Sequence, residues 1–413
     1  MNPRIPYAIA LLALAGAAPS LAQPRQEVKP PQAQAWIDVA TFSGLGLPMG
    51  GAGANPMAAL GALFGRGGGE RKVSFGMTQG GGSGRYVDVT LHSNLQPALA
   101  RATQEVPPTF LSPALELLAP REAPPAPARE ADDEVVPAQE PERPKGRILL
   151  YWGCGETVRA GQPRVLDLAS AGAADLAAVF QARRATQRGA HSAAGRPHWP
   201  NATDGRAVPD GASLAGPHQF SGAGVPEGFR FTVPPAQDLM PPLGLQQAER
   251  GGAVDLSWAA QPNARAFFVA GMGARSGDEM VMWTSSELPD SGFGLIDYQT
   301  NAAVDRWLRE KVLLASSTTR CTIPKGVFSG EGAMLRAIAY GHELNLAHPP
   351  RPTDPRQPWE PVWAVKLRVK SVATAVLGMP AVDTPAREAE PADRKDKEKK
   401  PGALDILRGV LGR

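Results

Sequence analysis

The sequence predicts a mostly β protein, with β-sandwich-like domain(s), one or two inserted helices and long disordered linkers. Three observations support this class. Glycine and proline contribute 45 and 42 of the 413 residues, a share typical of turn-rich β-structure and flexible segments. Short apolar runs that alternate with polar residues recur along the chain. Hydrophobic residues reach 43%, which is sufficient for a buried core.

Strands are expected wherever such runs contain β-branched and aromatic residues between turn-forming residues. These runs are 36–42, 72–77, 86–92, 148–152, 229–233, 243–247, 254–259, 266–272, 280–284, 319–323, 334–340 and 364–372. The last run alternates most clearly, with aliphatic residues on one side and Lys366, Arg368 and Lys370 on the other. Its pattern predicts one buried face and one basic, solvated face.

Two segments have the spacing of amphipathic helices. In residues 173–184, Leu176, Val179 and Phe180 fall on one side. In residues 301–314, Asn301 can cap the helix, and the apolar side is formed by Val304, Trp307, Leu308 and Val312.

The N-terminus has the pattern of a secretory signal peptide. Arg4 precedes an apolar run over residues 5–18, and Ser20-Leu21-Ala22 provides small residues at a cleavage site, so the mature chain would begin at Gln23. The run is shorter than the roughly 20 apolar residues of a membrane-spanning helix. We therefore expect a periplasmic or secreted protein without a transmembrane segment after cleavage.

Composition divides the mature chain into ordered and flexible parts. The expected organisation is a signal peptide (1–22), a flexible arm (23–35), a small β-rich region with Gly-rich loops (36–119), an acidic Pro-rich linker (120–146), a main β-rich domain (147–378, sandwich-like over about 220–378), a charged disordered tail (379–402) and a short amphipathic helix (403–413). The linker contains seven prolines among charged residues, a composition that cannot bury enough apolar surface to order itself.

The two cysteines, Cys154 and Cys321, are disulfide candidates. In an oxidising compartment two cysteines more often pair than remain free, although two separate buried thiols would also fit the sequence. Cys154 lies between glycines, an accessible position for a nucleophile, but no sequence motif links it to a histidine.

Other motifs fail the spacing that their chemistry needs. His342 and His348 are six residues apart, whereas a zinc-protease helix needs histidines four apart. The Gly-rich runs lack the Lys-Ser/Thr of a phosphate-binding loop. We expect no metal and no cofactor, and the net charge of +3 gives no reason to expect a nucleic-acid partner.

Two features could bind a partner. The C-terminal helix would place Leu404, Leu407 and Leu411 on one face at the end of a charged tether, which suits docking to an envelope protein or packing against its own domain. Trp199, Trp359 and Trp363 lie in or beside Pro-rich stretches, and could form a stacking platform or hold loops against the core.

The segment 254–345 resembles a fibronectin type III or related immunoglobulin-like β-sandwich. The resemblance depends on Leu256-Ser257-Trp258, Pro262-Asn263-Ala264, Phe267-Phe268-Val269 and Thr322-Ile323-Pro324. The helix expected at 301–314 departs from that topology. Residues 151–159 and 339–346 resemble a group of exported Gram-negative bacterial proteins, which implies a compartment and an architecture but no catalytic residues.

The function that fits best is a non-catalytic binding or scaffolding role in the cell envelope. The alternative is a periplasmic or secreted hydrolase acting on an envelope polymer or peptide. A hydrolase predicts a pocket that gathers histidines or carboxylates from several strands, whereas a binding protein predicts an exposed apolar patch or an open edge strand.

Overall fold

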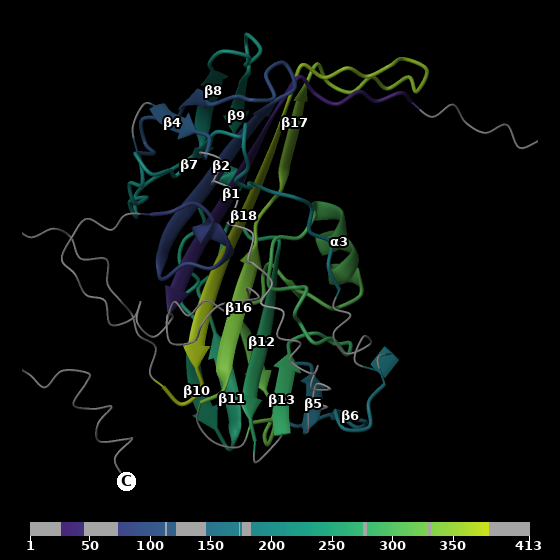
Figure 1. The fold of residues 1–413 in the computed structure, drawn as a ribbon. Coiled ribbons are helices and arrows are strands. Elements are labelled where there is room, and N and C mark those ends of the chain that lie inside the picture. The colour runs from purple at the N-terminus through teal and green to yellow at the C-terminus, as the bar shows by residue number, and fades with distance from the viewer. Residues whose placement is uncertain are drawn as a thin grey trace, which may run out of the picture. The chain divides into compact units, whose positions relative to one another are not determined.

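A computed structural model describes residues 26–44, 73–111, 114–120, 146–172, 174–175, 183–275, 279–328 and 332–379 (Figure 1). The predicted signal peptide, nearly all of the predicted linker, and the C-terminal helix with Leu404, Leu407 and Leu411 lie outside the described residues. So does most of the helix expected at 173–184. Within the described ranges, no helix is long and apolar enough to cross a membrane.

The described chain is mostly β, as predicted, with one α-helix. Fifteen strands form one mixed sheet: β1 (Ala33–Gly44), β2 (Gly84–Ser93), β3 (Arg101–Glu105), β4 (Ala114–Leu118), β5 (Arg147–Trp152), β6 (Arg164–Asp167), β7 (His198–Trp199), β8 (Gly216–Ser221), β9 (Arg230–Val233), β12 (Ala266–Ala274), β13 (Glu279–Thr284), β14 (Leu314–Ala315), β16 (Met334–Tyr340), β17 (Leu344–His348) and β18 (Trp363–Val376). A second sheet contains β10 (Gln246–Arg250), β11 (Ala253–Ser257) and β15 (Arg320–Ile323). The helical elements are η1 (Met77–Gln79), η2 (Pro235–Gln237) and α3 (Asn301–Arg309).

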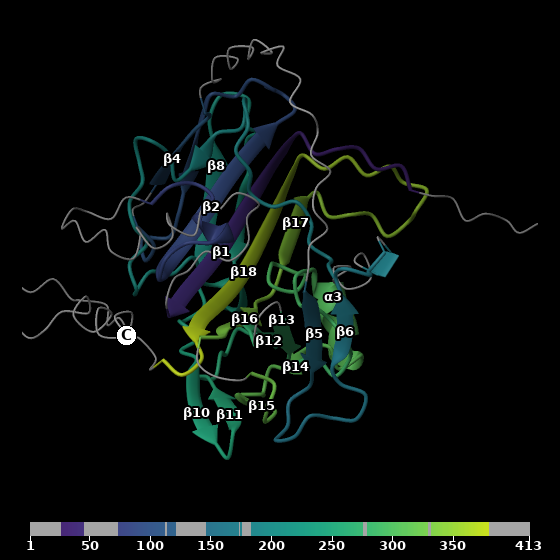
Figure 2. The same ribbon diagram turned by 60° about the horizontal axis from the view of Figure 1, so that its bottom comes forward.

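The large sheet has the order β6-β5-β13-β12-β16-β18-β1-β2-β7-β4-β3-β8-β9, and its two longest strands lie in the middle. β1 and β18 run parallel in register from Ala33 opposite Trp363 to Gly44 opposite Thr374. Figure 2 shows β2, β1 and β18 side by side although they come from opposite ends of the described chain. Strands of both predicted β-rich regions are therefore neighbours in one sheet.

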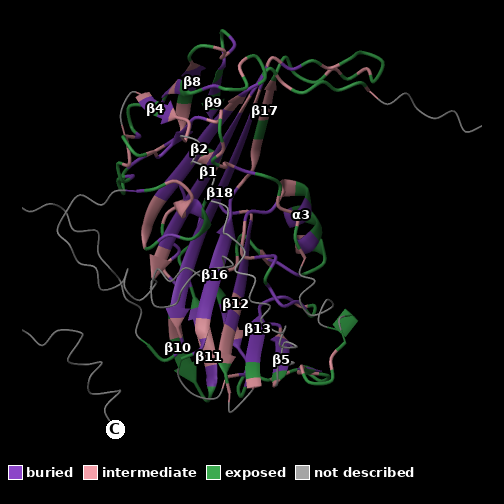
Figure 3. Cartoon of the chain, viewed as in Figure 1, coloured by how far each residue is buried: buried purple, intermediate pink, exposed green. Residues whose placement is uncertain are grey.

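Both faces of the central strands are buried, as the purple centre of Figure 3 shows. On one face, Ile37 and Val39 of β1 belong to the main hydrophobic core. That core also includes Leu256 and Ile323 of the small sheet, which therefore packs against the large one in a sandwich-like manner. On the other face, Phe42 joins a second cluster that includes residues of α3.

The helix α3 is confirmed, with different ends from those predicted. Thr300, not Asn301, is its N-cap, and the Thr300 side chain accepts a hydrogen bond from the Ala303 amide. The Asn301 side chain instead bonds both main-chain groups of Glu343, at 2.9 and 3.0 Å, and ties the helix to the chain before β17. The helix ends at Arg309 rather than 314, and Lys311 follows with a φ of 57°.

The strand predicted at 72–77 is wrong. Residues 75–79 form a turn and η1, beginning at Gly76 with a φ of 94°, a conformation that favours glycine. The Asp88 carboxylate accepts hydrogen bonds from the amides of Gly76 and Thr78, so the segment folds over β2 instead of pairing with it.

Candidate functional site

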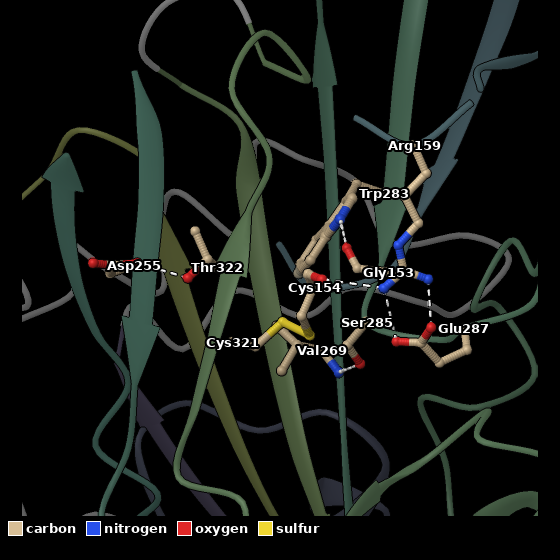
Figure 4. Close-up of a disulfide and its surroundings, with 10 residues drawn as sticks. All are labelled: Gly153, Cys154, Arg159, Asp255, Val269, Trp283, Ser285, Glu287, Cys321 and Thr322. Carbon is tan, nitrogen blue, oxygen red and sulfur yellow. Dashed lines mark hydrogen bonds and ion pairs between the residues drawn. A yellow bond between two sulfur atoms is a disulfide. The ribbon is translucent and has the colours of Figure 1, made fainter. Parts of the chain in front are cut away.

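The two cysteines form a disulfide, with an S–S distance of 2.09 Å. Cys154 follows β5 of the large sheet and Cys321 lies in β15 of the small sheet, so the bond joins the two sheets (Figure 4). The Gly155 amide also donates to the Thr322 carbonyl at 2.9 Å, next to the bridge. Both sulfurs are used, which excludes Cys154 as a free nucleophile.

Polar contacts fix the chain around the disulfide (Figure 4). The indole Nε1 of Trp283 donates to the Gly153 carbonyl at 3.0 Å, and Trp283 is fully buried. The Arg159 guanidinium pairs with Glu287 and also donates to the Cys154 carbonyl at 3.2 Å. The Arg159 and Glu287 side chains remain partly exposed, so these contacts describe a rigid junction rather than an open reactive site.

The predicted basic, solvated face of β18 is wrong, because all three basic residues are buried. Lys366, Arg368 and Lys370 are only 9%, 7% and 1% exposed. β18 is a central strand, and polypeptide outside the sheet covers the face on which they lie. A buried charge is tolerated only when it is paired, and each of the three has a carboxylate partner.

The pair at the centre joins Arg368 to Asp38 of β1. The Arg368 Nε and Nη2 atoms donate to the two Asp38 oxygens at 2.7 and 2.6 Å, a bidentate arrangement. The two residues are directly opposite in the parallel register of β1 and β18. Burial alone would lower the pKa of Arg368, but the carboxylate of Asp38 outweighs it and raises that pKa, so the guanidinium stays charged.

Two loops close over this pair. The Ala190 amide donates to Asp38 at 3.1 Å, and the Gln187 carbonyl accepts from Arg368 at 2.7 Å. A Cβ atom at Gly189 would lie 1.8 Å from the Arg368 Nη2 atom, so only glycine fits there. From the second loop, the Tyr298 ring lies 4.3 Å from the Arg368 Cζ atom, within the range of cation–π contact.

The flanking lysines are paired less symmetrically. Lys370 Nζ lies 3.2 Å from Asp297, and burial lowers the pKa of Lys370 to about 8. Lys366 Nζ lies 3.0 Å from Glu343, whose side chain is 6% exposed. Glu343 lies between β16 and β17, and its carboxylate neutralises the charge of Lys366.

A second carboxylate, Asp88, lies directly across from Asp38 on β2. Burial raises the pKa of Asp88 to about 6, although hydrogen bonds from Thr78 and Gly76 oppose this shift. We call the set Asp38, Asp88, Asp297, Glu343, Lys366, Arg368 and Lys370 the buried charge layer. Three carboxylates pair with the three cations, and Asp88 accepts hydrogen bonds from Gly76 and Thr78, so all seven side chains have partners within the fold. The layer is therefore a structural feature rather than a ligand site.

An open concave surface lies near the edge of the sheet, across β3, β8 and β9. A groove of about 700 Å³ runs between the end of β3 and the strands β8 and β9. Its lining includes the apolar residues Val106, Pro107, Pro217 and Phe231. Glu105 and Arg230 also line it and can make charged contacts. Its volume falls in the range of ligand-binding clefts.

Strand β9 also has main-chain groups at the open edge of the sheet, on its side away from β8. It is the last strand of the sheet, and the Phe220 amide donates to the Phe229 carbonyl across β8 and β9. Alternation in an antiparallel pair then directs the amide and carbonyl of Thr232 away from β8. Thr232 is exposed, and no other described strand pairs with this edge.

The groove contains one histidine, and both of its ring nitrogens are used. His218 Nε2 bonds the Leu214 carbonyl at 2.7 Å, and Nδ1 bonds the Gln104 amide at 3.1 Å. Its ring stacks on Phe231 with centroids 5.2 Å apart, and burial lowers the pKa of His218. The imidazole therefore supports the wall of the groove as a neutral ring.

The tryptophan platform is wrong for two of its three members. Trp199 and Trp363 are 0% and 7% exposed. Trp359 is half-buried, and its indole donates to the Pro349 carbonyl at 3.0 Å. Within the described ranges, no group of three or more His, Cys, Asp or Glu side chains is placed to hold a metal ion.

No protein-family model, no curated protein and no solved structure matches this chain. Function must therefore be inferred from the geometry of its surfaces. The groove was missed in the sequence because β3 and β8 were not predicted. The pair Pro107-Pro108 and the repeat Phe229-Arg-Phe231 were the available indications of an apolar surface there.

Proposed function

We propose that this is an exported, non-catalytic binding protein of the cell envelope, which takes an extended peptide segment of a partner at the open edge of β9, next to the groove across β3, β8 and β9. In this arrangement the peptide adds a strand to the open edge of the sheet. Main-chain hydrogen bonds would supply affinity, and the apolar lining would select side chains.

Export is supported by two independent observations. The N-terminal sequence has the charged, apolar and small-residue parts of a signal peptide. The Cys154–Cys321 disulfide is of the kind that persists in oxidising compartments. Mass spectrometry of the envelope-located protein should find a mature chain beginning at Gln23, and a chain retaining Met1 would contradict this part of the proposal.

The observation that carries the binding role is the main chain of Thr232, which points away from β8 at the open edge of the sheet. Arg230 is exposed and has no ion-pair partner among the described residues, so it is free to contact a carboxylate of the peptide. Natural edge strands that pair with nothing are usually covered, charged or short, and β9 is only four residues long. Such a strand suits a short peptide rather than a whole sheet.

A binding role fits this groove better than hydrolysis. A general base needs a free ring nitrogen or carboxylate oxygen within reach of the substrate proton, and both nitrogens of His218 are bonded. Glu105, the carboxylate that lines the groove, is exposed to solvent.

The C-terminal helix with Leu404, Leu407 and Leu411 remains a second proposed contact with an envelope partner. A tethered apolar helix could add avidity to a weak peptide site. Recovery of partners from envelope fractions, with and without residues 403–413, tests this contact. Equal recovery by both chains would contradict it.

The groove is tested by selecting peptides from a displayed library against the intact protein. Selected peptides should bind the wild type and Thr232→Val, which keeps the edge amide, but bind Thr232→Pro at least tenfold more weakly, because proline removes one edge hydrogen bond and its ring blocks strand addition. Among the described residues, no carbonyl accepts from the Thr232 amide, so both variants should fold. Equal binding to Thr232→Pro would overturn strand addition at β9.

A further inference from the structure

Four of the ten methionines lie on one face of three adjacent strands. They are Met280 and Met282 on β13, Met272 on β12 and Met334 on β16. Methionine has no particular preference for strands, which favour β-branched and aromatic residues, and ordering its flexible side chain costs conformational entropy. Their concentration here is therefore a departure from the local rules of strand formation, of the kind found at functional sites.

Three of these residues form a continuous row across the sheet. Met282 is directly opposite Met272 in the pairing of β13 with β12. Met272 is directly opposite Met334 in the pairing of β12 with β16. Directly opposite residues on antiparallel strands have Cβ atoms about 4.5–5.5 Å apart. We call Met282, Met272 and Met334 the methionine row.

The row faces away from the main core. The neighbouring residues Val281 and Leu335 belong to that core, so strand alternation places Met282 and Met334 on the opposite face. Met282 is itself part of a separate small cluster, and Met272 packs against that cluster. The sulfur of Met272, in the centre, is thus flanked by thioethers from both neighbouring strands.

Solvent reaches one end of this group. Met282 is 3% exposed, Met272 and Met334 are half-buried, and Met280 is 41% exposed. Figure 3 shows the strands β12, β13 and β16 changing from buried to intermediate and exposed towards the end that carries these residues. A small ion could therefore pass Met280 and reach the methionine row.

The chemistry of the row selects a soft cation. Thioether sulfur is a neutral, polarisable ligand that prefers Cu(I) over hard divalent ions. The cysteines do not compete for such an ion, because both are in the disulfide and the chain has no free thiol. Three methionine side chains, each with three rotatable bonds, can turn their sulfurs to one point between the strands.

We propose that the methionine row binds Cu(I) through the thioether sulfurs of Met282, Met272 and Met334, with Met280 at the entrance. This site is separate from the groove beside β9 and does not depend on the proposed peptide binding.

The test uses the full mature chain with its disulfide intact and with ¹³C-labelled methionine methyl groups. Ag(I), which has the same ligand preference as Cu(I) and needs no reductant, is titrated while methyl spectra are recorded. The methyl signals of Met272, Met282 and Met334 should move together and stop moving at one equivalent. Those of Met240, which is fully buried in the main core, and of Met379, which is 53% exposed, should not move.

Competition with bicinchoninate then measures Cu(I) itself under anaerobic conditions. Met272→Leu should weaken Cu(I) binding about tenfold or more, because it removes the central ligand of three. Met240→Leu and Met379→Leu should leave it unchanged. Leucine has nearly the volume of methionine, so the variants should fold, and thermal unfolding of each variant checks this.

Three results would overturn the proposal. One is the absence of methyl shifts in the row, and another is an equal shift of all methionine signals, including Met240 and Met379. The third is Cu(I) affinity that Met272→Leu and the combined substitution of all three row residues leave unchanged in correctly folded protein.

Discussion

The buried charge layer and the β9 groove are both polar features of the same sheet, but they meet opposite conditions. In the layer, Arg368 donates to both oxygens of Asp38 and is covered by the loop at Gly189. In the groove, Arg230 and the main chain of Thr232 face solvent. In this fold, a charged group at the centre of the sheet is paired inside the protein, whereas a group at the edge is free to bind a partner.

The position of each strand explains the difference. β18 has neighbours on both sides and polypeptide over both faces, so any charge on it must be matched inside the protein. β9 has a neighbour on one side only. Substitutions in the buried charge layer and at the groove should therefore distinguish structural charges from binding groups.

Removal of Asp38 should be the most damaging change in the charge layer. Asp38→Ala leaves the Arg368 guanidinium buried without its bidentate partner, and the free energy of unfolding should fall by about 3–5 kcal/mol. Glu116→Ala is the matched control, because Glu116 pairs with Arg101 on exposed strands β3 and β4, and it should cost less than about 1 kcal/mol. Denaturant unfolding measures both, and similar losses would contradict the central role of the Asp38 pair.

Asp88 should make stability depend on pH between about 4 and 6. Its pKa is raised to about 6 from an ordinary value of 3.8, so the folded state binds the proton more tightly than the unfolded state. Stability from this group is therefore fully present below pH 4 and is lost as the pH rises through 6, by about 3 kcal/mol. The unfolding free energy of the wild type, measured relative to that of Asp88→Asn at the same pH, should fall by this amount as the pH rises through 6. A difference that does not change with pH would contradict the raised pKa of Asp88.

Replacement of Lys370 should be tolerated, unlike that of Asp38. Its pKa is lowered to about 8 from 10.5, so the charged form is a cost at neutral pH that is relieved as the pH rises from 8 to 10.5. Lys370→Met should leave the free energy of unfolding at pH 7 unchanged or raise it by up to about 3 kcal/mol. The variant should also lack the rise above pH 8, and a loss of more than about 2 kcal/mol at pH 7 would show that the contact with Asp297 is required.

Substitution at the groove should leave stability unchanged and affect binding alone. Arg230→Ala removes an exposed side chain without a partner in the described residues and should alter the unfolding free energy by less than about 0.5 kcal/mol. It should weaken the binding of selected peptides that carry a carboxylate and leave the binding of neutral peptides unchanged. Arg250→Ala is the control, because Arg250 is exposed on β10 of the other sheet. It should leave the binding of both groups of peptides unchanged.

Much of the fold followed from local pattern. Alternation located β1, β2, β12, β16 and β18 to within a few residues, because long strands with one regular face have a strong period of two. The short strands β3, β4 and β8 escaped, since five or six residues with polar or proline positions differ little from a loop. The segment 72–77 alternates like a strand, but the carboxylate of Asp88 holds it as a turn.

The mostly β class, the helix beginning near residue 301 and the two residues able to form a disulfide all follow from the amino-acid sequence. The burial of Lys366, Arg368 and Lys370 and the source of their carboxylate partners depend on contacts between distant segments. The edge position of β9 and the row of three methionines depend on the same kind of contact. Alternation states which residues share a side of a strand, but only the neighbouring strands and loops, from distant parts of the chain, determine what covers that side.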